Sequence, residues 1–291
     1  MHGMCSNDIK GLATGTAEPA LILTEHAHII ADFFVFADAD ALLIDVDRAL
    51  WPKARAHLEK FLVADDVEFE ELENLGVIEV EGPAAVKVVA TVAGEAAESL
   101  PSWRHAEFDG VRCANLPRFG GPAFTLLVER ARIESVIQSL RERGASASVG
   151  DVAVVGTETL EIVRVEYGIA RVGVDTTEKT IALEARLDAA ISFSKGCYVG
   201  QETIERATAR GGVKKKLFGL RIEGNRLPLP GGSIMLAGKE AGRLTSVVRS
   251  PRLGVIGLSI LHHSAWPAGT RVTIADAAGE SIASVCELPF A

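Results

Sequence analysis

Residues 191–206 carry the most reactive group of side chains in the sequence. Cys197 lies in a loop bracketed by glycines, two residues after Lys195. The following sequence predicts a helix over residues 201–209, so that Cys197 precedes a helix N-terminus. Unpaired N–H groups at such an end, together with a nearby ammonium group, stabilise an anion. The pattern fits a thiolate nucleophile, a redox-sensitive thiol or one ligand of a soft metal. The alternative is a small buried hydrophobic residue, as most free cysteines are.

Polar side chains surround this loop. Gln201 and Glu202 fall in the first turn of the predicted helix, where they could cap or orient the loop. Arg206 and Arg210 are four residues apart and share a helix face. Together with the lysine run at 214–216, these arginines could hold carboxylates or phosphates.

A second candidate is Glu166, which falls at the end of a helix predicted over residues 157–167. The helix dipole disfavours a carboxylate at that end, so Glu166 needs a cationic partner or a ligand that donates hydrogen bonds. Facing a pocket, it could accept paired N–H bonds from an amino-heterocycle such as a pterin. The alternative is a surface ion pair with Arg164.

Composition sets limits on the class of protein. The chain has 291 residues, of which 48% are hydrophobic and 24% charged, as in ordinary globular proteins. The net charge is −9, which argues against a nucleic-acid partner, although residues 195–221 hold seven basic and two acidic residues. This basic island could focus an anionic ligand, or could be a solvated loop that balances the acidic run over residues 65–81.

The four cysteines are scattered without a C-x-x-C pair, so neither a disulfide scaffold nor a metal site is expected. The sequence has no run of 18 apolar residues and no apolar core of a signal peptide near its start. A monomeric cytoplasmic protein with reduced thiols and no membrane partner is expected.

The elements that must position these residues form an α+β pattern upstream and a strand-only pattern downstream. The predicted upstream strands cover residues 20–23, 28–36, 41–46, 67–71, 77–80, 111–116 and 123–129, with a hairpin turn at Asp109-Gly110. The predicted helices cover residues 49–63, 83–93, 131–143 (closed by Gly144) and 157–167 (with Thr157 as N-cap).

Six short strands then follow between turns containing glycine and proline, over residues 217–222, 233–236, 243–248, 255–260, 271–274 and 282–288. This spacing predicts a small antiparallel β-barrel. The domain boundaries expected from the change of pattern are 1–213 and 214–291.

The octapeptide at 195–202, K-G-C-Y-V-G-Q-E, resembles the hallmark of the YgfZ family of folate-binding, iron–sulfur-cluster-related proteins. That family is a branch of the glycine-cleavage T-protein (aminomethyltransferase) superfamily. Residues 164–168, 173–175 and 182–185 are similar to the T-protein segment that leads to the hallmark, and residues 6–9 and 29–33 are similar to early family segments.

The resemblance implies two interleaved α+β modules and a barrel around a central opening that binds tetrahydrofolate. Glu166 matches the glutamate that T-proteins use to hold the pterin, and Asp32 lies near their acidic position beside the reactive folate nitrogens. The predicted catalytic residues are Cys197, Lys195 and Asp32. The predicted cofactor-binding residues are Glu166, Arg164, Tyr198, Gln201, Glu202, Arg206 and Arg210, the last two with the lysine run as candidates for holding the glutamate tail.

Two departures from the family pattern bear on function. T-protein enzymes generally lack the cysteine of this hallmark, so Cys197 argues against simple aminomethyl transfer. Family members usually have a first β–α unit ahead of Ser6, where this sequence has five residues. The expected function is therefore a tetrahydrofolate-binding accessory protein for iron–sulfur cluster assembly or repair, with iron–sulfur client or assembly proteins as partners. The alternatives are a folate-dependent aminomethyl or one-carbon transferase, and an interaction protein that uses the basic island to bind RNA or an acidic partner.

Overall fold

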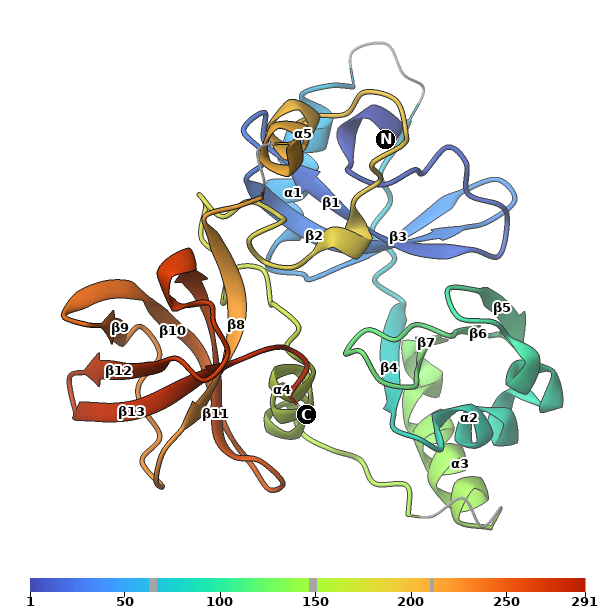
Figure 1. The fold of residues 1–291 in the computed structure, drawn as a ribbon. Coiled ribbons are helices and arrows are strands. Elements are labelled where there is room, and N and C mark those ends of the chain that lie inside the picture. Colours follow the sequence, from blue (N-terminus) through green and yellow to red (C-terminus); the bar gives the residue numbers. More distant parts are fainter. Residues whose placement is uncertain (63–66, 147–150, 210–211, 291) are drawn as a thin grey trace.

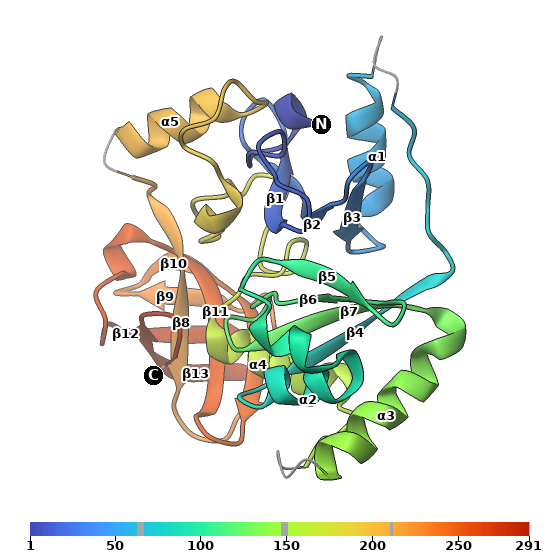
Figure 2. The ribbon, with the colours of Figure 1, turned by 90° about the vertical axis from the view of Figure 1, so that its right-hand side faces the viewer.

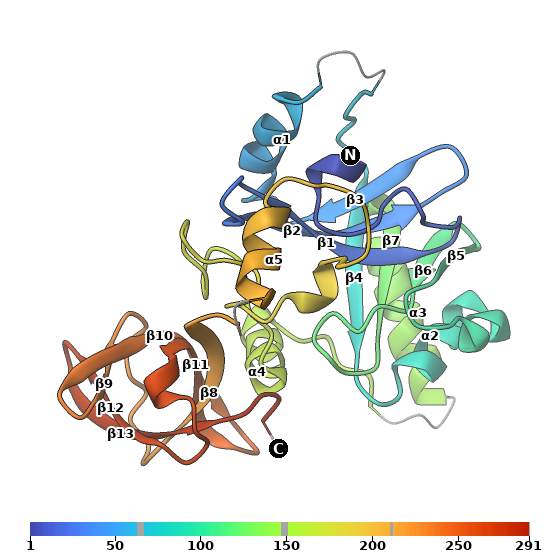
Figure 3. The ribbon, with the colours of Figure 1, turned by 45° about the horizontal axis from the view of Figure 1, so that its top comes forward.

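The computed structural model describes residues 1–62, 67–146, 151–209 and 212–290. Figure 1 shows three lobes, with α4 (Thr157–Tyr167) between the second lobe and the C-terminal barrel. Figure 3 shows the same arrangement from another side. The predicted α+β region followed by a small antiparallel barrel is confirmed. Within the described ranges, no helix is long and apolar enough to cross a membrane.

The first lobe is built on an antiparallel sheet in the order β1-β2-β3. Its elements are β1 (Ala17–Leu23), β2 (Ile29–Ala37), β3 (Leu42–Val46) and α1 (Trp51–Glu59), and α5 (Gln201–Ala209) joins them from far along the chain. Alternation along β2 separates two faces. Phe33 and Val35 pack against α1, whereas Phe34 and Phe36 face the second lobe.

The second lobe is a four-stranded antiparallel sheet in the order β4-β7-β6-β5, with two helices on one face (Figure 2). Its elements are β4 (Leu75–Glu81), α2 (Ala85–Ala93), β5 (His105–Phe108), β6 (Val111–Ala114), β7 (Ala123–Glu129) and α3 (Ile133–Ser146). The predicted hairpin turn is present, because Asp109 and Gly110 both have positive φ. The face away from the helices packs on the first lobe through a small apolar cluster that includes Phe36 and Leu127.

The third lobe is a closed barrel in the order β10-β11-β8-β13-β12-β9, filled by its own apolar core. Its strands are β8 (Lys215–Ile222), β9 (Ser233–Leu236), β10 (Lys239–Ser250), β11 (Gly254–His262), β12 (Arg271–Asp276) and β13 (Gly279–Cys286). A separate cluster joins Leu21 of β1, Val165 of α4, Ile204 of α5 and Leu258 of β11. The first lobe and the barrel therefore share a core with α4 and α5.

Three predicted details were wrong. Residues 67–71 form no strand, because Phe69 packs edge-on against Trp51 and Glu71 accepts a hydrogen bond from the Trp51 indole, without a neighbouring strand. Gly144 does not end α3, which continues to Ser146. The N-cap of α4 is Gly156 rather than Thr157.

Candidate functional site

Asp32 lies on the face of β2 that looks toward the second lobe, opposite Leu21 of β1. Burial raises the pKa of its carboxyl, while the charges of Arg118 and Arg171 act in the opposite direction. No other residue in the described ranges donates a hydrogen bond to this carboxylate. Asp32 is therefore a shielded acceptor whose hydrogen-bonding capacity is left open.

Arg118, in the loop before β7, bridges the two sheets. Its guanidinium lies 4.2 Å from the ring centroid of Phe34 and forms an ion pair with Asp45 of β3. Its Nε atom donates to Thr125 at 2.8 Å and lies 3.1 Å from a carboxylate oxygen of Glu79 on β4. One cation therefore pairs with an acidic group from each lobe and links the two sheets.

Glu81, at the end of β4, is the next residue on the same face as Glu79. Its Oε1 atom is buried without a hydrogen-bond partner among the described residues. Burial, with a further contribution from the charge of Glu79, raises the pKa of Glu81 to about 7. The sheet thus carries one carboxyl tied to Arg118 and a second that is unpaired.

Glu166, at the C-terminal end of α4, contacts the turn between β10 and β11. It accepts a hydrogen bond from Ser250 and lies 3.2 Å from Nη2 of Arg252. The predicted ion pair of Glu166 with Arg164 is therefore wrong. The neighbouring Tyr167 turns the other way: a Cβ added at Gly121 would lie 2.7 Å from the Tyr167 hydroxyl.

Arg164 is buried and points away from Glu166. Its five N–H groups donate to Glu161 (twice), Ile169, Asp175 and Ser246. No donor is left for a cofactor in this arrangement. The guanidinium instead ties α4 to the following segment and to β10 of the barrel.

Lys195 is likewise occupied by the protein. Its buried ammonium group donates to the backbone oxygens of His2, Cys5 and Asn7 at 2.5, 2.8 and 2.7 Å. It therefore fastens the N-terminal segment, including the short helix η1 (His2–Met4), to the hallmark loop. Cys197, two residues further, is exposed.

The remaining predicted residues lie on or near α5. Tyr198 is buried in the central core, and Gln201 accepts a hydrogen bond from its N–H at 3.2 Å, as expected for a residue that orients the loop. Glu202 and Arg206 form an exposed ion pair on the helix surface. Arg210 lies outside the described residues. No hydrogen bond or ion pair joins this group to Glu166 or Asp32 within the part of the chain that the structure describes.

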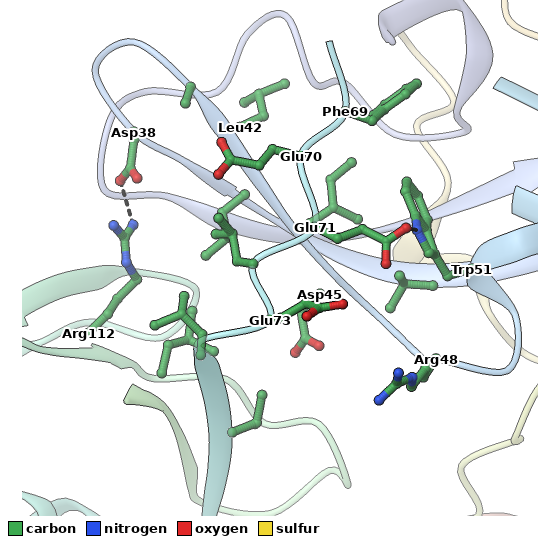
Figure 4. Close-up of a pocket in the computed structure, with 18 of the residues that line it drawn as sticks. Asp38, Leu42, Asp45, Arg48, Trp51, Phe69, Glu70, Glu71, Glu73 and Arg112 are labelled. Atoms are coloured by element: carbon green, nitrogen blue, oxygen red, sulfur yellow. Dashed lines mark hydrogen bonds and ion pairs between the residues drawn. The ribbon is translucent and has the colours of Figure 1, made fainter. Parts of the chain in front are cut away.

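A cavity lies elsewhere, between the edge strands β3 and β4 and the linker over residues 67–74. Its volume is about 800 Å³, and none of the described site residues predicted from the sequence lines it. Figure 4 shows Glu70, Glu71 and Glu73 on the linker in front of the first sheet, with Asp38 paired to Arg112. We place the candidate site near Arg118 instead, at Asp32 and Glu81, because neither carboxyl receives a hydrogen bond from another described residue and such groups point to a ligand.

Sequence reasoning missed Arg118, Glu79, Glu81 and Tyr167. The alternation over residues 77–81 places both glutamates on one face of a predicted strand, and this was the available signal. The burial of that face depends on the other lobe, which the local sequence does not reveal.

Comparison with known proteins supports this architecture. Residues 1–195 match the GCVT N-terminal domain, and residues 215–291 match the glycine cleavage T-protein C-terminal barrel domain. The chain belongs to the glycine cleavage T-protein family.

Relatives of this T-protein family member carry transferase names. An aminomethyltransferase of Rubrobacter xylanophilus is 28% identical over 89% of the chain and 69% of its own length. A putative chloroplastic transferase of Arabidopsis thaliana is 27% identical over the whole chain and 66% of its own length. The chain thus spans about two thirds of these relatives.

A solved structure has the same fold: the glycine cleavage system aminomethyltransferase T of Bartonella henselae, with a TM-score of 0.85 and 22% identity over 99% of this chain and 79% of that one. The fold of the T-protein family member is therefore aminomethyltransferase-like. Assignment to the YgfZ branch rests on the motif at 195–202 alone and stays a prediction.

Proposed function

We propose that this T-protein family member of the YgfZ branch binds tetrahydrofolate or a one-carbon derivative. We further propose that it supports the assembly or repair of iron–sulfur proteins through Cys197. The observation that carries folate binding concerns two carboxyls near Arg118. Among the described residues, Oε1 of Glu81 has no hydrogen-bond partner, and Asp32 accepts only from its own backbone N–H. Buried polar groups are normally hydrogen-bonded, and an amino-heterocycle brings the missing N–H donors.

The hydrogen-bonding groups of the site suit this cofactor. Asp32 would accept N–H bonds from the ligand, and Glu166 would exchange its contact with the exposed Arg252 for contacts with the pterin. When bound, tetrahydrofolate supplies nitrogen atoms that carry a one-carbon unit. Arg118 would hold the two sheets at a fixed separation around it.

The role of Cys197 is supported by its place in the fold. The thiol is exposed, while Lys195 and Gln201 fasten the loop on both sides of it. A fixed loop that presents an exposed thiol suits contact with a client protein better than chemistry inside the folate site. The clients proposed are iron–sulfur enzymes or their assembly proteins.

Calorimetric titration with tetrahydrofolate tests the first half of the proposal. Glu166→Ala is expected to abolish binding with little effect on stability. Glu223→Ala, on the barrel surface in an exposed pair with Arg271, is the matched control and should bind normally. Failure of the native chain to bind any tetrahydrofolate species would overturn the proposal.

Complementation tests the second half. In a strain deleted for the protein, Cys197→Ser is expected to leave iron–sulfur enzyme activity low, whereas Cys286→Ser should restore it. Full restoration by Cys197→Ser would remove the thiol from the mechanism.

The alternative activity is a folate-dependent one-carbon transfer, which is favoured by the relatives named aminomethyltransferase and by the shielded Asp32. In that case, Asp32 would polarise the folate and Glu166 would position it. Formation of methylene-folate and free ammonia from an aminomethyl donor, lost in Asp32→Asn, would establish this activity in place of the accessory role.

A further inference from the structure

Glu81 forms no hydrogen bond or ion pair that would stabilise the described part of the fold. Its neighbour Glu79 accepts a hydrogen bond from Thr125 at 2.9 Å and pairs with Arg118. Arg118 already forms ion pairs with Asp45 and Glu79, so its single positive charge is shared between two acids other than Glu81. A carboxyl buried beside another carboxyl without its own donor destabilises the folded chain. Such a group in a native protein calls for a functional explanation.

The position of Glu81 links it to the helix that carries Glu166. The next residue, Gly82, donates its N–H to the backbone oxygen of Pro122 at 3.0 Å. Gly121, beside Pro122, lies against the ring of Tyr167. The end of β4 is therefore joined through this loop to the C-terminal end of α4, where Glu166 lies (Figure 1).

We propose that Glu81 is a ligand-binding residue that stays protonated in the complex and donates an O–H hydrogen bond to an acceptor atom of the bound pterin. This inference rests on the proposed folate binding and deepens it. A pterin presents both N–H donors and lone-pair acceptors on its edge, so a site of ionised carboxylates alone would leave the acceptors unpaired. Asp32 and Glu166 would accept, and Glu81 would donate.

The charges around Glu81 favour this protonation state. Glu79 on the same strand acts against ionisation of Glu81, and Arg118 on the loop before β7 acts in its favour. Burial is the larger influence, and the resulting pKa of about 7 leaves a large protonated fraction at neutral pH. Tyr167 of α4 is a titratable side chain that packs against Gly121 of this loop. A ligand atom that accepts a hydrogen bond from the O–H of Glu81 would stabilise the protonated form of the carboxyl.

The test is titration of the full chain with tetrahydrofolate under reducing conditions at pH 6 and pH 8.5. The apparent Kd of the native protein is expected to rise roughly 30-fold between these values, as the competent protonated fraction falls. In Glu81→Gln the amide keeps a donor and does not titrate, so the Kd should change little. Glu81→Met removes the donor and should bind about 3- to 10-fold more weakly than the native chain at pH 6. Glu107→Gln, on the exposed surface of β5, is the control and should behave as the native chain.

The outcomes separate the two proposals. Binding by the native chain with the same pH dependence in Glu81→Gln would overturn the role of Glu81 and leave folate binding standing. Native-strength binding by Glu81→Met at pH 6 would do the same. No binding by the native chain at either pH would overturn the folate proposal and this inference together. A cooperative unfolding transition in denaturant for each variant confirms that each comparison concerns folded protein.

Discussion

Asp175 is buried and Glu81 is half-buried, and the surroundings of these two acids are opposite. Asp175 accepts hydrogen bonds from Arg164, from the N–H of Arg171 and from the hydroxyls of Thr245 and Ser246. Glu81 has no such donors. The first arrangement is that of a structural carboxylate, whereas the second leaves room for a ligand. Asp175 therefore stabilises the fold, whereas Glu81 is available to bind a ligand.

The unpaired acid should make stability depend on pH. The pKa of Glu81 is raised to about 7 in the folded chain. The contribution of the protonated carboxyl to the free energy of unfolding is therefore fully present below the ordinary pKa near 4.5, and it is lost as the pH rises through 7. Glu81→Gln removes that loss. In urea denaturation without ligand, the variant should gain stability relative to the native chain between pH 5 and pH 8. If the difference in free energy of unfolding between Glu81→Gln and the native chain is the same at pH 5 and pH 8, Glu81 is solvated in the folded chain.

Lys195 is expected to stabilise the N-terminal segment rather than to activate Cys197. Lys195→Met removes the donor to three backbone oxygens and should cost about 1–3 kcal/mol. Burial shields Cys5 and raises the pKa of its thiol. Labelling of Cys5 by a thiol reagent should therefore accelerate at least about tenfold in the variant.

Lys53→Met is the control for Lys195→Met, because Lys53 forms an exposed pair with Glu178 and should leave Cys5 protected. Unchanged labelling of Cys5 in both variants would show that other contacts hold the segment.

The end of α4 sets the position of Glu166 at the scale of the element. Gly168 closes the helix with φ +71°, and a Cβ there would lie 2.6 Å from Leu288. Gly168→Ala should therefore cost about 2–4 kcal/mol and weaken folate binding. Gly156→Ala at the other end meets no atom within 4 Å and should cost less than about 1 kcal/mol. Equal costs for the two variants in urea denaturation would contradict this account.

Local sequence patterns predicted most elements, because the relevant signals are short-range. An apolar run predicted β2, the pair Asp109-Gly110 predicted a hairpin, and the helix predicted over residues 157–167 is α4. Lys195 shows where such reasoning stops. Its nearness to Cys197 suggested an electrostatic role, yet its donors meet oxygens about 190 residues earlier in the chain. Arg118 and Glu81 were missed for the same reason, since their surroundings come from two lobes.

At the scale of the whole molecule, the network around Arg164 joins α4 to the barrel. Asp175→Ala leaves this buried guanidinium without its fully enclosed counter-ion and should cost about 3–5 kcal/mol. Glu223→Ala, in an exposed pair, should cost less than about 1 kcal/mol. Urea denaturation followed by Trp fluorescence measures both. A loss below about 1 kcal/mol for Asp175→Ala would show that apolar packing alone holds the barrel to α4.

The return of late residues to the first lobe bears on how the protein is made. Ser192 donates its N–H to the backbone oxygen of Ser6 at 2.9 Å, and Ile204 of α5 belongs to the same core as Leu21 of β1. The second lobe, by contrast, is continuous from β4 to α3. During translation, the second lobe can close as soon as residue 146 has left the ribosome, whereas β1 must wait for residues beyond 200. The opening strands of the chain thus spend most of synthesis unfinished, and their apolar faces are the natural targets for a chaperone at the exit tunnel.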